Sequence, residues 1–177
     1  MISRDLQTIY VMWLRDVKGF FRSKVRIITT LIVPFSLLFF VSFGFNSGFR
    51  VPGMPEGVNY LDYAAPGIIG MTMLFGSIFA GISVLWDKEF GFLKEIMVAP
   101  VSRLSIAIGR TIGGLTTTLL QGLLILFLSL FFGFRISDIF SLILGIIFMI
   151  LISMTFIGLG FIFASVMRDM QAFQLIM

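Results

Sequence analysis

Four long stretches without a charged residue dominate the pattern of this chain. They run from Ile27 to Phe49, Gly67 to Trp86, Thr111 to Phe134 and Ile139 to Met167, and contain 23, 20, 24 and 29 residues. At a helical rise of about 1.5 Å per residue, each stretch reaches about 30 Å or more, the thickness of a bilayer's hydrocarbon core. The pattern predicts an all-α fold, a polytopic transmembrane helix bundle with four complete spans, 27–49, 67–86, 111–134 and 139–167, and the start of a fifth.

A different pattern precedes the first span. Within residues 4–26, apolar residues recur every three or four positions, as on one face of a helix, and basic residues lie on the opposite face. We expect residues 1–26 to form an amphipathic helix in the plane of the cytoplasmic membrane surface. The alternative is a helix packed on a soluble domain, and no such domain is visible in the chain. The residues expected to act at the interface are Trp13, Arg15, Lys18, Phe20, Phe21 and Arg22.

Small residues spaced four apart recur in the spans. Such pairs let helix backbones approach closely inside a membrane, where the lipid gives no hydrophobic drive for association. Packing within the chain and a seam between two copies are both open readings. The pairs are Gly76 and Ala80, Gly109 and Gly113, and Gly160 and Ala164.

The basic residues are unevenly distributed between alternate loops. Of 13 Lys and Arg residues, 11 fall on the side of the N-terminus, and only Arg50 and Arg135 fall on the other. The positive-inside rule then predicts a multi-pass protein of the cell (cytoplasmic or inner) membrane with a cytoplasmic N-terminus. Basic residues beside membrane helices also explain the net charge of +4, so we expect no nucleic-acid partner.

Composition removes several kinds of chemistry. The chain has no Cys and no His, so we expect no catalytic residue and no metal site. The four stretches also hold no ionisable residue of the kind that pumps and secondary transporters use for coupling. An intramembrane enzyme is therefore the weakest alternative, and a membrane assembly or scaffold protein is a stronger one.

The loop between the second and third spans, residues 87–110, carries the most specific pattern. A short amphipathic helix would end at Pro100, and Ser102 can cap the next helix, which runs through Arg110 into the third span. From the residues alone, an ordinary interfacial turn and a rigid element gripped by a cytoplasmic partner are equal alternatives.

This loop resembles that of ABC-transporter permeases of the type 2 exporter family. The resemblance rests on Glu89 and Gly91, Pro100-Val101-Ser102-Arg103, Gly109-Arg110 and the entrance Ala65-Pro66-Gly67. Phe92 and Ala99 depart from it, since small hydroxyl residues are frequent there. The family has six spans, so the chain is expected to be a C-terminally truncated single permease domain, 1–177, without its fifth and sixth spans.

The resemblance implies a membrane-spanning permease subunit of an ATP-driven exporter for an amphiphilic drug, lipid or polysaccharide. Two permease subunits, as a homo- or heterodimer, would work with a separate cytoplasmic ATP-binding cassette subunit. No cofactor is expected in this chain, since it lacks the G-x-x-x-x-G-K-[ST] loop and is not itself an enzyme; ATP and Mg are expected on the partner. The implied coupling-helix contacts are Glu89, Gly91, Lys94, Glu95, Pro100 and Arg103.

Overall fold

The computed structural model describes residues 2–45, 59–89, 101–136 and 138–166. These residues form helices joined by short turns, and the described part of the chain contains no strand. The elements are α1 (Ile2–Arg22), α2 (Lys24–Phe40), a π-helical turn η1 (Val41–Phe45), α3 (Tyr60–Glu89), α5 (Arg103–Phe131) and α6 (Ile139–Val166). Within these described residues, four helical segments are long and apolar enough to cross a membrane, so the prediction of an all-α polytopic bundle is confirmed.

The apolar stretches located the spans, but α3 and α5 begin earlier than predicted, at polar residues, and α5 ends at Phe131 rather than at the predicted Phe134. Helix α3 begins at Tyr60, before the predicted start at Gly67, and continues through Pro66. Helix α5 begins at Arg103, where the side chain of Ser102 accepts a hydrogen bond from the Ser105 backbone N–H, which confirms the predicted cap. It ends before Gly133, whose φ of 100° suits glycine.

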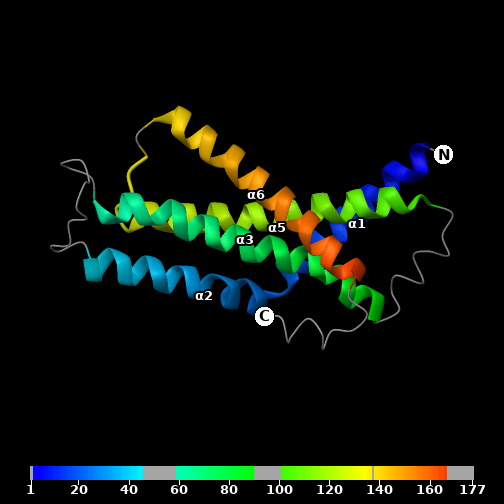
Figure 1. Ribbon diagram of the computed structural model, residues 1–177, viewed down its shortest axis with the longest axis horizontal. Helices are drawn as coiled ribbons and strands as arrows, with labels where there is room; N and C mark the ends of the chain where they lie inside the picture. Colours follow the sequence, from blue (N-terminus) through cyan, green and yellow to red (C-terminus); the bar gives the residue numbers. More distant parts are fainter. Residues whose placement is uncertain (1, 46–58, 90–100, 137, 167–177) are drawn as a thin grey trace.

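Helix α3 lies at the centre of the bundle, with α5 and α6 packed against it (Figure 1). It crosses α6 where two glycines meet, because a Cβ added to Gly81 would lie 2.8 Å from the Gly160 Cα. Helix α2 makes fewer contacts, and its buried Leu38 joins an apolar core with Met73 and Ile125 of α3 and α5. Close backbone approach thus holds α3 against α6, and side-chain packing holds α2 against α3 and α5.

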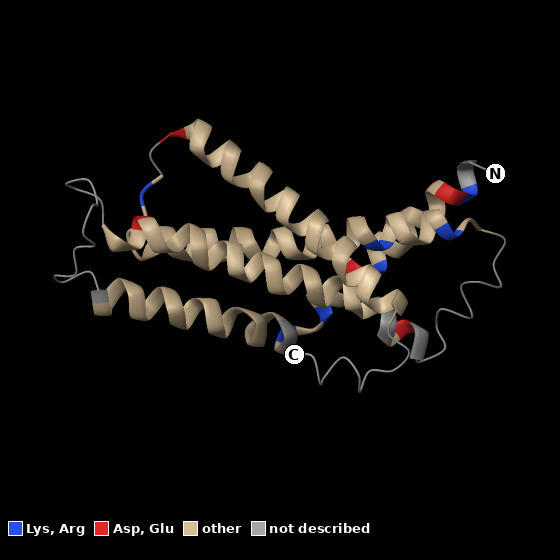
Figure 2. Cartoon of the chain, viewed as in Figure 1, with Lys and Arg blue, Asp and Glu red and all other residues tan. Residues whose placement is uncertain are grey.

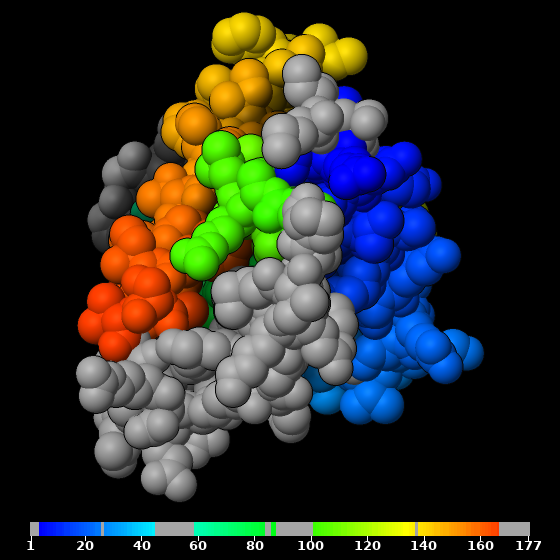
Figure 3. Space-filling model, turned by 90° about the vertical axis from the view of Figure 1, so that its right-hand side faces the viewer, coloured from blue at the N-terminus to red at the C-terminus, as the bar shows by residue number. Residues whose placement is uncertain are grey.

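Charged residues collect at the two ends of the bundle (Figure 2). The end that carries α1 is seen face-on in Figure 3, with α1 in blue beside the start of α5 in green. At the opposite end, the backbone N–H of Arg135 donates to the Asp62 carboxylate at 2.9 Å and ties the α5–α6 turn to the start of α3.

The predicted amphipathic helix over residues 1–26 is corrected at its C-terminal end. It stops at Arg22, and Ser23, with φ −94° and ψ 77°, separates it from α2, so Arg26 belongs to the next helix. The break lets the chain turn from the side of α5 into the first span. Helix α1 is also more than an interfacial helix, because it packs along α5: Met12 and Phe20 are buried, while Leu6, Tyr10 and Phe21 are exposed.

Candidate functional site

Four charged side chains from three helices form a closed ring, which we call the ion ring. Arg15 and Asp16 come from α1, Asp87 from the end of α3 and Arg110 from the start of α5. Arg15 Nη2 lies 2.9 Å from Asp87 Oδ2 and 3.4 Å from Asp16 Oδ1. Arg110 Nη1 lies 2.9 Å from Asp16 Oδ1, and Arg110 Nη2 pairs with Asp87. Each cation therefore meets both anions, and the ring carries no net charge.

Glycines on α5 let α1 come close enough to complete the ring. A Cβ added to Gly113 would lie 2.8 Å from Asp16 Oδ2, and one added to Gly109 would lie 2.8 Å from the Met12 Cβ. One turn further along α5, the Trp13 indole N–H donates to the Thr116 hydroxyl at 3.0 Å. The pair Gly109 and Gly113 thus serves packing within the chain, between α5 and α1.

A second attachment lies near the start of α1. The Asp5 carboxylate accepts from the Ser102 backbone N–H at 3.2 Å and from the Ser105 hydroxyl at 3.0 Å. These hydrogen bonds hold the pKa of Asp5 below its ordinary value of 3.8. Since Asp5 meets the start of α5 and Asp16 meets Arg110 further along, α1 and α5 run in the same direction.

The two attachments connect α1 to the residues on both sides of the segment 90–100. The ion ring binds α1 to Asp87, which lies just before that segment, and Asp5 binds it to Ser102, which lies just after. A displacement of either end of residues 90–100 would therefore be transmitted to α1, α3 and α5.

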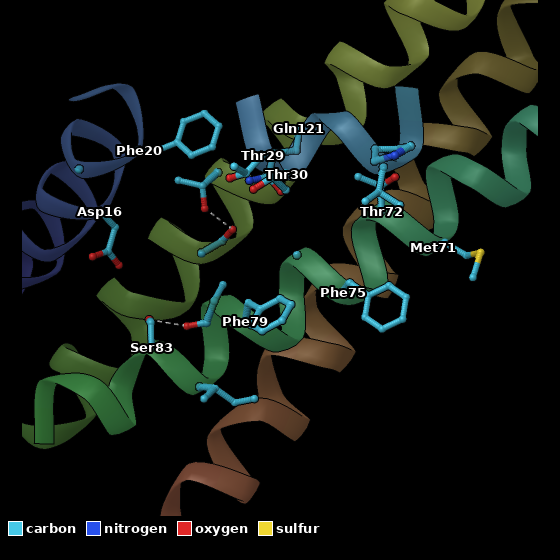
Figure 4. Close-up of a pocket in the computed structure, with 18 of the residues that line it drawn as sticks. Asp16, Phe20, Thr29, Thr30, Met71, Thr72, Phe75, Phe79, Ser83 and Gln121 are labelled. Atoms are coloured by element: carbon cyan, nitrogen blue, oxygen red, sulfur yellow. Dashed lines mark hydrogen bonds between the residues drawn. The ribbon is translucent and has the colours of Figure 1, made fainter. Parts of the chain in front are cut away.

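A cavity of about 1100 Å³ extends from the ion ring between α1, α2, α3 and α5 (Figure 4). One face of α5 lines it at helical spacing, through Arg110, Gly114, Thr117 and Gln121. The lining of α3 runs from Ile68 to Asp87, which corresponds to about 30 Å of helix. The cavity therefore follows the bundle over most of the depth of a membrane.

The structure separates the residues predicted from the sequence into three groups. Gly91, Lys94, Glu95 and Pro100 lie outside the described residues, as does the side chain of Glu89, while Arg103 is exposed at the start of α5. On α1, Trp13, Arg15 and Phe20 turn inward, and Lys18, Phe21 and Arg22 are exposed. The small residues Gly76, Ala80 and Gly160 lie at helix contacts, and Ala164 is buried.

Sequence reasoning missed the ion ring. It placed Arg15 on the outward basic face of the first helix, whereas its guanidinium turns inward to Asp16 and Asp87 because both anions lie within reach. The available signal was Asp16, which is four residues from both buried Met12 and buried Phe20 and so lies on an inward face. An acid at such a position needs a cation from another helix.

Residues 7–177 match a family model described as ABC-2 type transporter. The chain belongs to this family. The predicted resemblance is thereby confirmed for nearly the whole chain, and the four apolar helices among the described residues agree with a multi-pass membrane protein.

Several curated relatives support the same assignment. The protein ycf38 of Cyanophora paradoxa, named as a transport permease, is 30% identical over 135 residues, which cover 74% of this chain and 45% of the relative. The inner membrane transport permease YadH of Escherichia coli K12 is 29% identical over 121 residues, which cover 68% of this chain and 46% of the relative. The matched region thus spans less than half the length of these relatives, and no solved structure matches the chain significantly.

Proposed function

We propose that this chain forms the membrane pathway of an ATP-driven exporter for an amphiphilic substrate. A separate cytoplasmic ATP-binding cassette subunit would supply the energy and hold ATP and Mg, and two permease subunits would work together. The family match and the transport permeases among the relatives support this proposal.

The observation that carries the coupling part of the proposal is the position of α1. Energy from a separate subunit reaches a pathway only through an element whose arrangement both sites bias. Residues 87–110 join two spans, and α1 is attached before and after residues 90–100 through the ion ring and Asp5. We propose that the ATP-binding subunit docks on this loop and that α1 and the ion ring carry its movement to α3 and α5.

The proposed orientation puts the ion ring in the cytoplasmic half of the membrane. Eleven of the 13 Lys and Arg residues fall on the side of the N-terminus, as the positive-inside rule requires of a cytoplasmic face. The Escherichia coli relative is named as an inner membrane protein, which agrees with a cell-membrane location.

Docking and transmission are tested separately. In membranes that contain the permease and a candidate ATP-binding subunit, Glu89→Lys with Glu95→Lys should reduce co-purification of that subunit. Glu56→Lys, the same change in the predicted outer loop, should leave co-purification unchanged. Normal binding and normal efflux in the double variant would remove this loop from the mechanism.

Transmission of the movement is tested at Arg15. Its side chain is one-third exposed, so Arg15→Gln removes the more exposed cation of the ion ring and leaves the buried Arg110 in place. Arg15→Gln should keep the ATP-binding subunit bound but lower substrate-stimulated ATP hydrolysis and efflux. Lys18→Gln removes an exposed cation from the same helix and is the matched control. Equal effects of the two changes would contradict a role for the ion ring.

A further inference from the structure

Three hydroxyl groups that line the cavity have already used their hydrogens. Thr72 donates to the Ile68 carbonyl at 2.8 Å, Thr117 to the Gly114 carbonyl at 2.9 Å, and Ser83 to the Ala80 carbonyl at 2.6 Å. A hydroxyl has one hydrogen and two lone pairs, so each of these oxygens can still accept but has no second hydrogen to donate. These three groups offer acceptors to a ligand.

Gln121 adds a stronger acceptor at mid-depth of the cavity. It is 6% exposed, and among the described residues its Oε1 has no hydrogen-bond partner. The oxygen lies against Gly76, where an added Cβ would come within 2.8 Å of it. The terminal torsion of a glutamine side chain is soft and roughly two-fold, so the amide can turn this oxygen from Gly76 toward the cavity. A hydrogen-bond donor on a molecule in the cavity would then pair with Gln121 Oε1.

The charges at the end of the cavity are satisfied by one another. The ion ring holds two cations and two anions, and each cation meets both anions. The cavity therefore offers no net charge to an ionic ligand, and an ion would lose its hydration without compensation.

The cavity opens sideways along α3. Met71, Phe75 and Phe79 line it at four-residue spacing, yet each side chain is about half exposed. Figure 4 shows these three side chains along one edge of α3. Among the described residues this edge of α3 is open, which would let a lipid-soluble molecule enter from the side.

We propose that this cavity binds a neutral amphiphile that carries hydroxyl groups, with a hydroxyl donating to Gln121 Oε1 and the apolar body lying along Phe75 and Phe79. The inference rests on the proposed transport function, since it names the chemistry of the molecule that the pathway accepts. It predicts that removing the hydrogens from the ligand's hydroxyls weakens binding, and that removing the amide of Gln121 abolishes the difference.

The test uses two brominated probes that differ only in donor capacity. One is 1-(9,10-dibromostearoyl)glycerol, and the other is its 2,3-di-O-methyl ether, which keeps the acceptors and loses both donors. The chain is held in phosphatidylcholine nanodiscs with Trp13→Phe, so that Trp86, which lines the cavity, is the single tryptophan that bromine can quench. Probe molecules dissolved in the surrounding lipid also quench Trp86, and this background is the same for every variant.

The diol should reach half-quenching at a concentration about fivefold lower than the ether, as expected for one net hydrogen bond. Gln121→Leu should remove this preference, and Thr72→Val should reduce it. Gln7→Leu, the same change at an exposed position of α1, should retain it. Equal quenching by both probes in the parent, or a preference that survives in Gln121→Leu, would overturn the proposal.

The assay contains no ATP-binding subunit, so its outcome is independent of the coupling experiment. If the hydroxyl preference is absent while Arg15→Gln still uncouples ATP hydrolysis, the inference about the ligand fails and the transport proposal stands. If Arg15→Gln and Lys18→Gln have equal effects while the preference is present and depends on Gln121, the coupling role of the ion ring fails and the binding site stands.

Discussion

At the scale of single residues, Arg110 is the side chain on which the ion ring depends most. It is 8% exposed, and both of its partners, Asp16 and Asp87, are more exposed than it is. A buried charge is tolerated only when it is paired, and removing one member leaves the others uncompensated. Without Arg110, two carboxylates would share Arg15 alone.

Arg110→Gln should therefore lower the free energy of unfolding by roughly 3 kcal/mol. The measurement is thermal unfolding in detergent micelles, followed by circular dichroism. Arg103→Gln removes an exposed cation from the first turn of the same helix and should change stability by less than about 1 kcal/mol. Similar losses in the two variants would mean that the ring contributes nothing beyond surface charge.

Asp5 should make stability depend on pH in a predictable direction. Its pKa is lowered in the folded chain by hydrogen bonds from the Ser102 backbone and the Ser105 hydroxyl, so the folded state holds fewer protons than the unfolded state. The stabilisation is present above the ordinary value of 3.8 and is lost as pH falls through the lowered folded value.

As the pH falls below about 4, the melting temperature of the parent should fall more than that of Asp5→Asn. The difference between the two curves isolates Asp5, because the other carboxyl groups titrate in both proteins. Parallel curves over this range would contradict the role given to the Asp5 hydrogen bonds.

At the scale of helices, the contact of α3 with α6 depends on the absence of a side chain. A Cβ on Gly81 would lie 2.7 Å from the Ile157 carbonyl oxygen and 2.8 Å from the Gly160 Cα, both of them backbone atoms that cannot turn away. Gly81→Ala should push the helices apart and cost about 1–3 kcal/mol of unfolding free energy.

The matched control is Gly158→Ala on α6, where an added Cβ meets nothing within 4 Å. Alanine favours a helix over glycine, so this variant should be as stable as the parent or more stable. The two melting temperatures should therefore move in opposite directions. A loss in Gly158→Ala equal to that in Gly81→Ala would point to glycine's flexibility rather than to the helix crossing.

The sequence predicted the helices well but the contacts between them poorly, for a physical reason. A span is a local property, because length and apolarity over about 20 residues determine it. A contact such as Arg15 with Asp87 joins residues 72 positions apart, and its existence depends on how three helices cross. The cavity likewise needs the faces of several helices at once, and Gln121 by itself reads as an ordinary polar residue in a span.

At the scale of the whole molecule, the distribution of charge predicts how the chain sits in the membrane. The described charged residues lie at the two ends of the bundle, with most of the basic ones at the end of α1 (Figure 2). The chain has no native Cys, so Gly57→Cys and Lys94→Cys each carry a single thiol, in loops predicted to face opposite sides.

In intact cells, a membrane-impermeant maleimide should label Gly57→Cys and leave Lys94→Cys unlabelled until the membrane is permeabilised. The permeabilised sample shows that both thiols can react. Labelling of Lys94→Cys alone in intact cells would reverse the orientation and place the ion ring on the outer side.

The path of α1 along α5 also fixes an order of events during synthesis. Asp5 leaves the ribosome 97 residues before its partner Ser102, an interval of about 5–20 s at ordinary elongation rates. Arg110 is the last member of the ion ring to be made, 94 residues after Asp16. Until then Asp16 and Phe20 have no α5 to pack on, and the basic residues of α1 can hold it on anionic lipid. The first helix to be translated is thus among the last to pack, because α1 can pack on α5 only after the third span has been made and inserted.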